Sequence, residues 1–345
     1  MAIVLLTCAT GSPGVTTSAL ALTLCWPRDV LLVDSDRDVS QTVQAGWLGA
    51  RPLATRGLVE LAQAHREMRP VAPLLWDRTV SLLDDAPAGS AGVPDQAMGR
   101  FDATGQPIAD QRPGAPAVAE SRLVARQFLP GFSHPGSVAV FDPVWPEVAE
   151  ALAGLAGSGV DVIVDAGRVG HQGLPSALLG AADVVLMVVR SSLRSLAAAR
   201  LHLPPLRERT AALAPAAKLG LLVVGPSRPY SDGDVEAQFG VPVVADMAWQ
   251  PEEAAVLSEG GDEPRRFRER SFMRSASAAA SAVSARVIAT PNSSRDLATG
   301  TSRSHDPLTG SIGRAPVQSA GVTPGARDRM AGPVDPPLAT GRPRP

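Results

Sequence analysis

The residues of this chain that could do chemistry fall into two sets: a glycine-containing turn near the start, and three aspartates at the ends of apolar runs. The turn separates the apolar run 3–8 from the helix-like run 18–24. A turn between a strand and a helix presents backbone N–H groups and the positive helix end to an anion. The turn therefore predicts a phosphate-binding loop, and the residues expected to contact nucleotide are Gly11, Ser12, Pro13, Gly14, Val15, Thr16 and Thr17.

The aspartates follow two apolar runs that have the character of buried strands. Asp34 and Asp36 follow the run 29–33, and Asp165 ends the run 160–164. The carboxyl ends of parallel strands share one edge of a sheet, where ligands bind, so these acids and the turn should meet there. Nucleotide hydrolysis needs a held Mg²⁺ and an aimed water. We expect Thr16, Asp34 and Asp165 to hold or support the metal and Asp36 to position the water, although a strand-end aspartate is also a common cap or turn residue.

The turn lacks the lysine that phosphate loops place before their threonine. Val15 stands at that position, and Lys218 is the only lysine of the chain, so no other lysine can replace it. Arginine could compensate, because Arg37, Arg168 and Arg190 follow or end strands at the expected edge. A planar guanidinium would, however, contact phosphate with different geometry from a compact ammonium.

Alternating strands and helices predict an α/β fold, a mostly parallel twisted sheet with helices on both faces. One domain is expected at 1–290, with a disordered insertion at 84–121 and a disordered tail at 291–345, since both segments are rich in small and polar residues. Strands are predicted at 3–8, 29–34, 79–83, 160–165, 183–189, 219–224 and 241–244. Helices are predicted at 18–24, 40–48, 56–66, 145–156, 192–201, 206–214, 234–239, 251–258 and along 272–287.

Composition and charge give expectations about membrane spans, cellular location and binding partners. The 345 residues carry a net charge of −2, and no uninterrupted apolar run approaches the length of a membrane span, about 20 residues. No signal peptide is recognised, so a cytoplasmic location is expected. Residues 263–345 hold 13 arginines against 6 acidic residues. Non-specific DNA binding is one interpretation of this segment, and a solvated tail is the favoured one.

The motifs together resemble those of the ParA/MinD family of deviant-Walker P-loop ATPases. The family loop reads K-G-G-V-G-K-T-T and aligns one for one with residues 10–17; Asp34-Ser35-Asp36 matches its D-x-D, and residues 162–165 match its Walker B strand. The resemblance covers residues 1–260 apart from the insertion, and implies a three-layer P-loop fold, ATP, Mg²⁺ and a homodimer. Thr10 and Val15 replace both loop lysines, and Gly225 stands where the family often has an adenine-reading asparagine.

Three functional hypotheses follow. The favoured one is a degenerate nucleotide-binding module that positions or regulates a cellular machine for partitioning, pilus assembly or secretion. Its degenerate loop and insertion resemble the TadZ/CpaE-like subgroup, which implies a partner such as a secretion or pilus-type ATPase. The alternative is an active Mg-ATPase that cycles between monomer and dimer, with arginine in place of the lysines. A dinucleotide-binding enzyme is the third, and the absence of a G-x-G-x-x-G pattern in the turn disfavours it.

Overall fold

The structure is a computed structural model that describes residues 2–9, 13–53, 56–83, 125–170 and 173–288. Within these residues, eight strands form one sheet in the order β3-β4-β2-β5-β1-β6-β7-β8. Every neighbouring pair is parallel except β3 and β4, which are antiparallel. The strands are β1 (Ile3–Cys8), β2 (Val30–Asp34), β3 (Val80–Ser81), β4 (Arg126–Leu129), β5 (Asp161–Arg168), β6 (Val184–Arg190), β7 (Lys218–Val224) and β8 (Val243–Met247).

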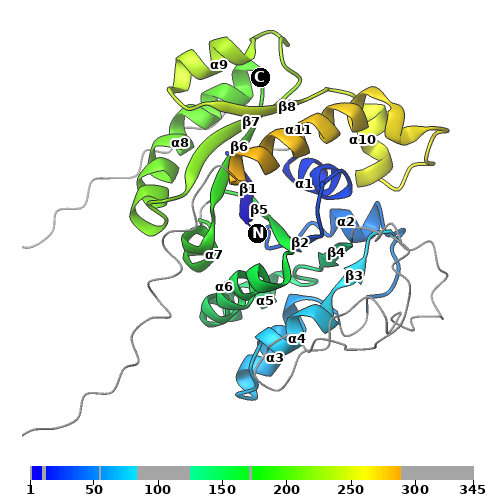
Figure 1. The fold of residues 1–345 in the computed structure, drawn as a ribbon, viewed down its shortest axis with the longest axis vertical. Coiled ribbons are helices and arrows are strands. Elements are labelled where there is room, and N and C mark those ends of the chain that lie inside the picture. The colour runs from blue at the N-terminus through cyan, green and yellow to red at the C-terminus, as the bar shows by residue number, and fades with distance from the viewer. Residues whose placement is uncertain (1, 10–12, 54–55, 84–124, 171–172, 289–345) are drawn as a thin grey trace, which may run out of the picture. The chain divides into compact units, whose positions relative to one another are not determined.

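Helices cover both faces of this sheet, as the sequence predicts (Figure 1). Apolar side chains of β1 alternate between the two faces of the sheet. Ile3 and Leu5 belong to the core on one face, and Val4 and Leu6 belong to the core on the other. The helices are α1 (Val15–Leu24), α2 (Thr42–Ala45), α3 (Leu58–Arg66), α4 (Ala72–Leu75), α5 (Pro135–Val140), α6 (Trp145–Gly154), α7 (Ser176–Ala181), α8 (Leu193–Leu213), α9 (Asp232–Phe239), α10 (Pro251–Ser258) and α11 (Ser271–Ile288).

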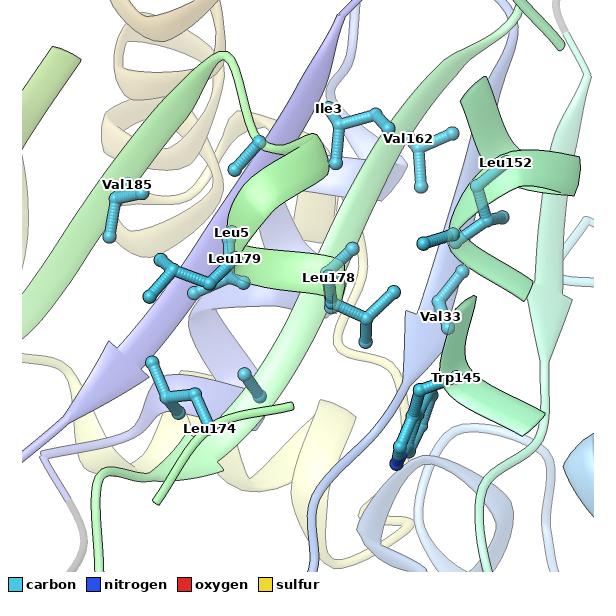
Figure 2. Close-up of a cluster of buried hydrophobic side chains, with 14 of the residues drawn as sticks. Ile3, Leu5, Val33, Trp145, Leu152, Val162, Leu174, Leu178, Leu179 and Val185 are labelled. Atoms are coloured by element: carbon cyan, nitrogen blue, oxygen red, sulfur yellow. The ribbon is translucent and has the colours of Figure 1, made fainter. Parts of the chain in front are cut away.

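Two hydrophobic cores pack the strands against the helices of these layers. In the first core, Leu178 and Leu179 of α7 lie over Leu5 of β1 and its neighbours (Figure 2). The second core packs α1, α10 and α11 against the opposite face, and it contains the predicted apolar face of the last helix. The members of that face are all buried, namely Phe272, Ala276, Ala279, Ala280, Val283 and Val287.

Several predicted element bounds are wrong. The two helices expected at 192–201 and 206–214 are one helix, α8, with Pro204 and Pro205 inside it. A proline costs a helix the hydrogen bond to the carbonyl four residues earlier. Burial of Leu203 and Leu206 on either side keeps α8 continuous despite that cost.

Other corrections concern the strands and the loops between them. The expected strand end at Asp165 is wrong, because β5 continues to Arg168, which pairs with Cys8 of β1. The helix expected at 40–48 shrinks to α2, because Gly46 turns the chain closely against the backbone of α10. The strand expected at 241–244 lies at 243–247.

The insertion at 84–121 and the tail at 291–345 lie outside the described residues. None of the helices in the described part of the chain is long and apolar enough to cross a membrane.

Candidate functional site

Asp34, the last residue of β2, and Asp165, three residues before the end of β5, lie side by side in the sheet. They are register partners on β2 and β5, and the residues are 8% and 2% exposed. The chain after β2 is fixed to β5, because the Ser35 N–H and hydroxyl both donate to the Asp165 carbonyl oxygen, at 2.8 and 3.0 Å. The sequence predicted this meeting of the two acids at one sheet edge, and the structure confirms it.

Two glycines that the motifs did not single out make room for the acids. A Cβ atom at Gly131 would lie 2.7 Å from Cγ of Asp34. A Cβ atom at Gly167 would lie 2.0 Å from Oδ1 of Asp36, and Gly167 also has a φ of +57°. Side chains at either position would collide with the carboxylates, so these glycines belong to the site. Only tertiary contacts reveal them, because each glycine is distant in sequence from its aspartate.

Burial makes the charged forms of these acids unfavourable. The pKa of Asp165 rises to about 6, mainly through burial and with a contribution from Asp36. The pKa of Asp34 rises well above its usual value through burial and the charge of Asp165. Burial also raises the pKa of Asp36, against which Arg168 and the Asp38 backbone act. A cation placed here would relieve the unfavourable charge of all three groups.

The buried Asp165 carboxylate accepts fewer hydrogen bonds than its two oxygens could take. Its Oδ1 accepts from the Gly167 N–H at 3.0 Å, whereas the buried Oδ2 makes no geometrically well-formed hydrogen bond within the described chain. The nearby Thr16 hydroxyl favours the charged carboxylate. No cluster of three or more His, Cys, Asp or Glu ligands occurs among the described residues. The Asp34 and Asp165 carboxylates and the Thr16 hydroxyl are oxygen donors, the kind that Mg²⁺ takes in nucleotide sites, where phosphate and water complete its shell.

The turn predicted to bind phosphate leads into helix α1. Helix α1 begins after Gly14, which has a φ of +93°, and no side chain caps its first N–H groups. Such a helix start still offers backbone donors to an anion. Val15, however, is 9% exposed and belongs to the second hydrophobic core. The predictions for Thr10, Gly11 and Ser12 lie outside the described residues, while Pro13, Thr16 and Thr17 flank or begin this helix.

The three arginines considered as replacements all engage other groups. Arg37 pairs with Asp142, and the Arg168 Nη1 atom lies 3.7 Å from Oδ2 of Asp38. The Arg190 guanidinium stacks over the Trp249 ring at 3.7 Å from its centroid. Trp249 also covers Gly225, where a Cβ atom would lie 2.9 Å from the tryptophan Cβ. Arg168 is the arginine that acts on the acid cluster, since it lowers the pKa of Asp36.

Solved structures with the same fold come from the MinD and ParA ATPases. The MinC:MinD cell division complex of Aquifex aeolicus has 13% identity over 83% of this chain and 96% of that chain, with a TM-score of 0.53. A ParA family ATPase from Chlorobium tepidum has 13% identity over 81% of this chain and 98% of that chain, with a TM-score of 0.54.

A third structure of this fold is a nucleotide complex, Cyanothece McdA with ATP. It has 14% identity over 82% of this chain and 96% of that chain, with a TM-score of 0.53. No protein-family model matches the sequence, and no curated protein matches it significantly. At these identities the comparisons show the fold, which is the α/β P-loop architecture of the MinD and ParA proteins.

Proposed function

We propose that this chain is a degenerate P-loop module that positions a protein machine and does not sustain multi-turnover ATP hydrolysis. The observation that carries the proposal is the burial of Val15 in the second hydrophobic core. A lysine at that loop position neutralises β- and γ-phosphate charge. An apolar side chain offers no charge-assisted contact to the phosphates.

Nucleotide binding itself has support from the metal side of the site. Asp165 keeps a carboxylate oxygen without a well-formed hydrogen bond, and Thr16 lies beside it. The uncapped start of α1 keeps backbone donors for phosphate. The module therefore binds Mg-ATP weakly, through backbone donors and the metal, with Thr16, Asp34 and Asp165 around Mg²⁺ and residues 11–17 around the phosphates.

The positioning role is inferred from the fold and from the resemblance of the motifs. One protein of the same fold is seen in a MinC:MinD complex. We place the partner of this chain in a partitioning, pilus-assembly or secretion machine, in line with the TadZ/CpaE-like features of its loop. Non-specific DNA stays a second partner hypothesis, tied to the arginine-rich segment after residue 262.

The competing function is a Mg-ATPase that cycles between monomer and dimer. The retained acids favour it, because a site without metal chemistry has little need for Asp34 beside Asp165 in a buried position. Arg168, which acts on Asp36, would then supply phosphate charge. In that case Asp36→Ala should abolish hydrolysis and spare ATP binding, and light scattering should show a dimer that forms with Mg-ATP. The proposed module should keep one mass with and without nucleotide.

Calorimetric titration of the full chain with Mg-ATP tests the proposal. We expect weak binding, and a roughly tenfold gain in affinity for Val15→Lys, because a hydrogen bond to a charged group contributes about 1.5–3 kcal/mol. Val15→Ile is the matched control, since it keeps an apolar side chain at the same position and should leave the affinity unchanged. An unchanged affinity in a folded Val15→Lys variant would show that this helix start does not contact phosphate.

A further inference from the structure

A cavity of about 270 Å³ lies on the far side of Asp34 from Asp165's strand, between β4 and the segment that leads into α3. Pockets for drug-sized ligands enclose roughly 300–1,000 Å³, so this cavity suits a smaller molecule. Its wall includes the carboxyl ends of β2 and β4, the first turn of α3 and the glutamines around α2. The phosphate loop residues 13–17 are not part of that wall.

Two carboxyl groups line the cavity, and Glu60 is the main source of its negative charge, because burial and the neighbouring Asp165 make the charged form of Asp34 unfavourable. Asp34 lines it, and in the described chain the hydrogen bond to its carboxylate comes from the Asp36 N–H to Oδ1 at 3.1 Å. Glu60, in the first turn of α3, also lines it, and its Oε2 atom is buried without a hydrogen-bond partner among the described residues. A buried carboxylate oxygen without a donor is costly, and a donor-bearing ligand would remove that cost.

The one basic residue of the wall is already committed to the protein backbone. Arg56 Nη1 donates to the carbonyl oxygens of Asp77 and Thr79, which directs this guanidinium nitrogen toward the β3 side of the cavity. Arg56 keeps its positive charge in these bonds, and no ion pair joins it to Asp34 or Glu60 among the described residues.

The rest of the wall divides into an apolar part and an amide part. Val59, Phe128 and Phe132 provide apolar and aromatic surface, while Gln41 and Gln44 provide side-chain amides. Alkyl stems pack on apolar surface while a cationic head is stabilised by aromatic faces and carboxylates. Acids, aromatic rings and amides around one small volume thus define a ligand with a positive head and a short apolar stem.

We propose that this cavity binds a small organic cation, a guanidinium or primary ammonium group on a short alkyl stem, held by Glu60 and Asp34. The cation can be a free diamine-like metabolite or an arginine or lysine side chain of a partner protein, since both present the same group. The proposal does not depend on nucleotide binding, because its contacts, apart from Asp34, lie outside the candidate nucleotide site.

Calorimetry or ligand-observed NMR on the full chain without nucleotide tests this site. The probes are agmatine, the tripeptide Gly-Arg-Gly, and butanol as an uncharged molecule with a similar stem. We expect agmatine or the tripeptide to bind in the millimolar range or better, and butanol not to bind. Binding of agmatine would identify a free cation as a suitable occupant, whereas binding of the tripeptide alone would assign the site to a protein side chain.

Three variants make the result specific to the cavity. Glu60→Gln should weaken binding roughly tenfold or more, because it removes a charge-assisted contact. Glu67→Gln is the matched control at the end of the same helix, outside the cavity wall, and should bind as the unchanged protein does. Val59→Phe should reduce binding by filling the cavity. Unchanged melting temperatures verify that the variants fold.

The proposal is overturned if neither agmatine nor the tripeptide binds, if butanol binds as well as agmatine, or if Glu60→Gln binds as well as the unchanged protein.

Discussion

Strand β5 carries two buried aspartates, and they differ in how completely the protein bonds them. Asp161, at the start of the strand, accepts from the Ala2 N–H, the Trp26 indole and the Arg28 Nε atom at 2.7–2.8 Å. Asp165, four residues on, interacts with the Gly167 N–H and the Thr16 hydroxyl, and has an acidic neighbour in Asp34. The two acids share a strand and a residue type, so the difference in their hydrogen bonding comes from the residues around them.

This difference indicates a structural role for Asp161 and a candidate ligand-binding role for Asp165. Asp161 is completely buried and ties β1, β5 and the segment after α1 together, so its bonds stabilise the fold. Burial makes the charged form of Asp165 unfavourable, and its hydrogen bonds do not offset this cost. Buried groups of this kind are candidates for ligand binding. The part of β5 around Asp165, beside the end of β2, is therefore the place to look for a bound ligand.

Replacement of Asp161 should have the largest effect on stability. Asp161→Ala leaves the Trp26 N–H and the Arg28 guanidinium without their acceptor. The Arg28 side chain is 33% exposed and can reach water, but the Ala2 and Trp26 N–H groups lose a buried acceptor at a cost of about 1–3 kcal/mol each, so we expect a loss of about 2–5 kcal/mol in the free energy of unfolding. Urea denaturation at pH 7.5 measures it. A loss of unfolding free energy smaller than that of an ordinary surface substitution would show that Asp161 does not stabilise the fold.

Replacement of Asp165 should have the opposite sign in the absence of ligand. Its folded-state pKa of about 6 lies above the usual 3.8, so ionisation above pH 6 costs the folded protein stability. Asp165→Asn should therefore raise the free energy of unfolding at pH 7.5 by about 2–3 kcal/mol. This gain should shrink as the pH falls from 6 toward 4, because Asp165 becomes protonated in the folded state while the unfolded state is still largely ionised; below the unfolded-state pKa of 3.8 both states are protonated and the gain is lost. Denaturation curves at several pH values check the trend, and a destabilised Asp165→Asn at pH 7.5 would contradict it.

Magnesium should produce the smallest of these effects, and only through Asp165, the less completely bonded of the two aspartates. At several times its dissociation constant, a bound cation raises the free energy of unfolding by roughly 1 kcal/mol. Thermal denaturation with and without millimolar Mg²⁺ should show this for the unchanged protein and not for Asp165→Asn. Equal responses would place the cation elsewhere.

The sequence could predict the parts of this molecule that depend on local patterns. The apolar strand runs, the shared edge of Asp34 and Asp165, and the buried face of α11 all follow from burial periodicity. The continuity of α8 could not be predicted, because Pro204 and Pro205 signal a break and tertiary packing overrides it.

Features of the site that depend on distant contacts also escaped prediction. Room for Asp36 comes from Gly167, and the stacking of Arg190 comes from Trp249. Each pair joins separate elements, so no spacing rule connects its members. The contacts of the three candidate arginines show this most clearly. Their positions near strand ends predicted that all three would lie near the phosphates, whereas each contacts another side chain.

Steady-state ATP hydrolysis by the full chain tests the central claim most directly. The comparison is between the unchanged protein and Asp165→Asn, at millimolar Mg-ATP. Val15 lies in the hydrophobic core and gives the phosphates no charged contact. We therefore predict that both proteins show the same background rate of hydrolysis, without multiple turnovers. Magnesium-dependent turnover by the unchanged protein that Asp165→Asn abolishes would contradict the account and establish a working ATPase.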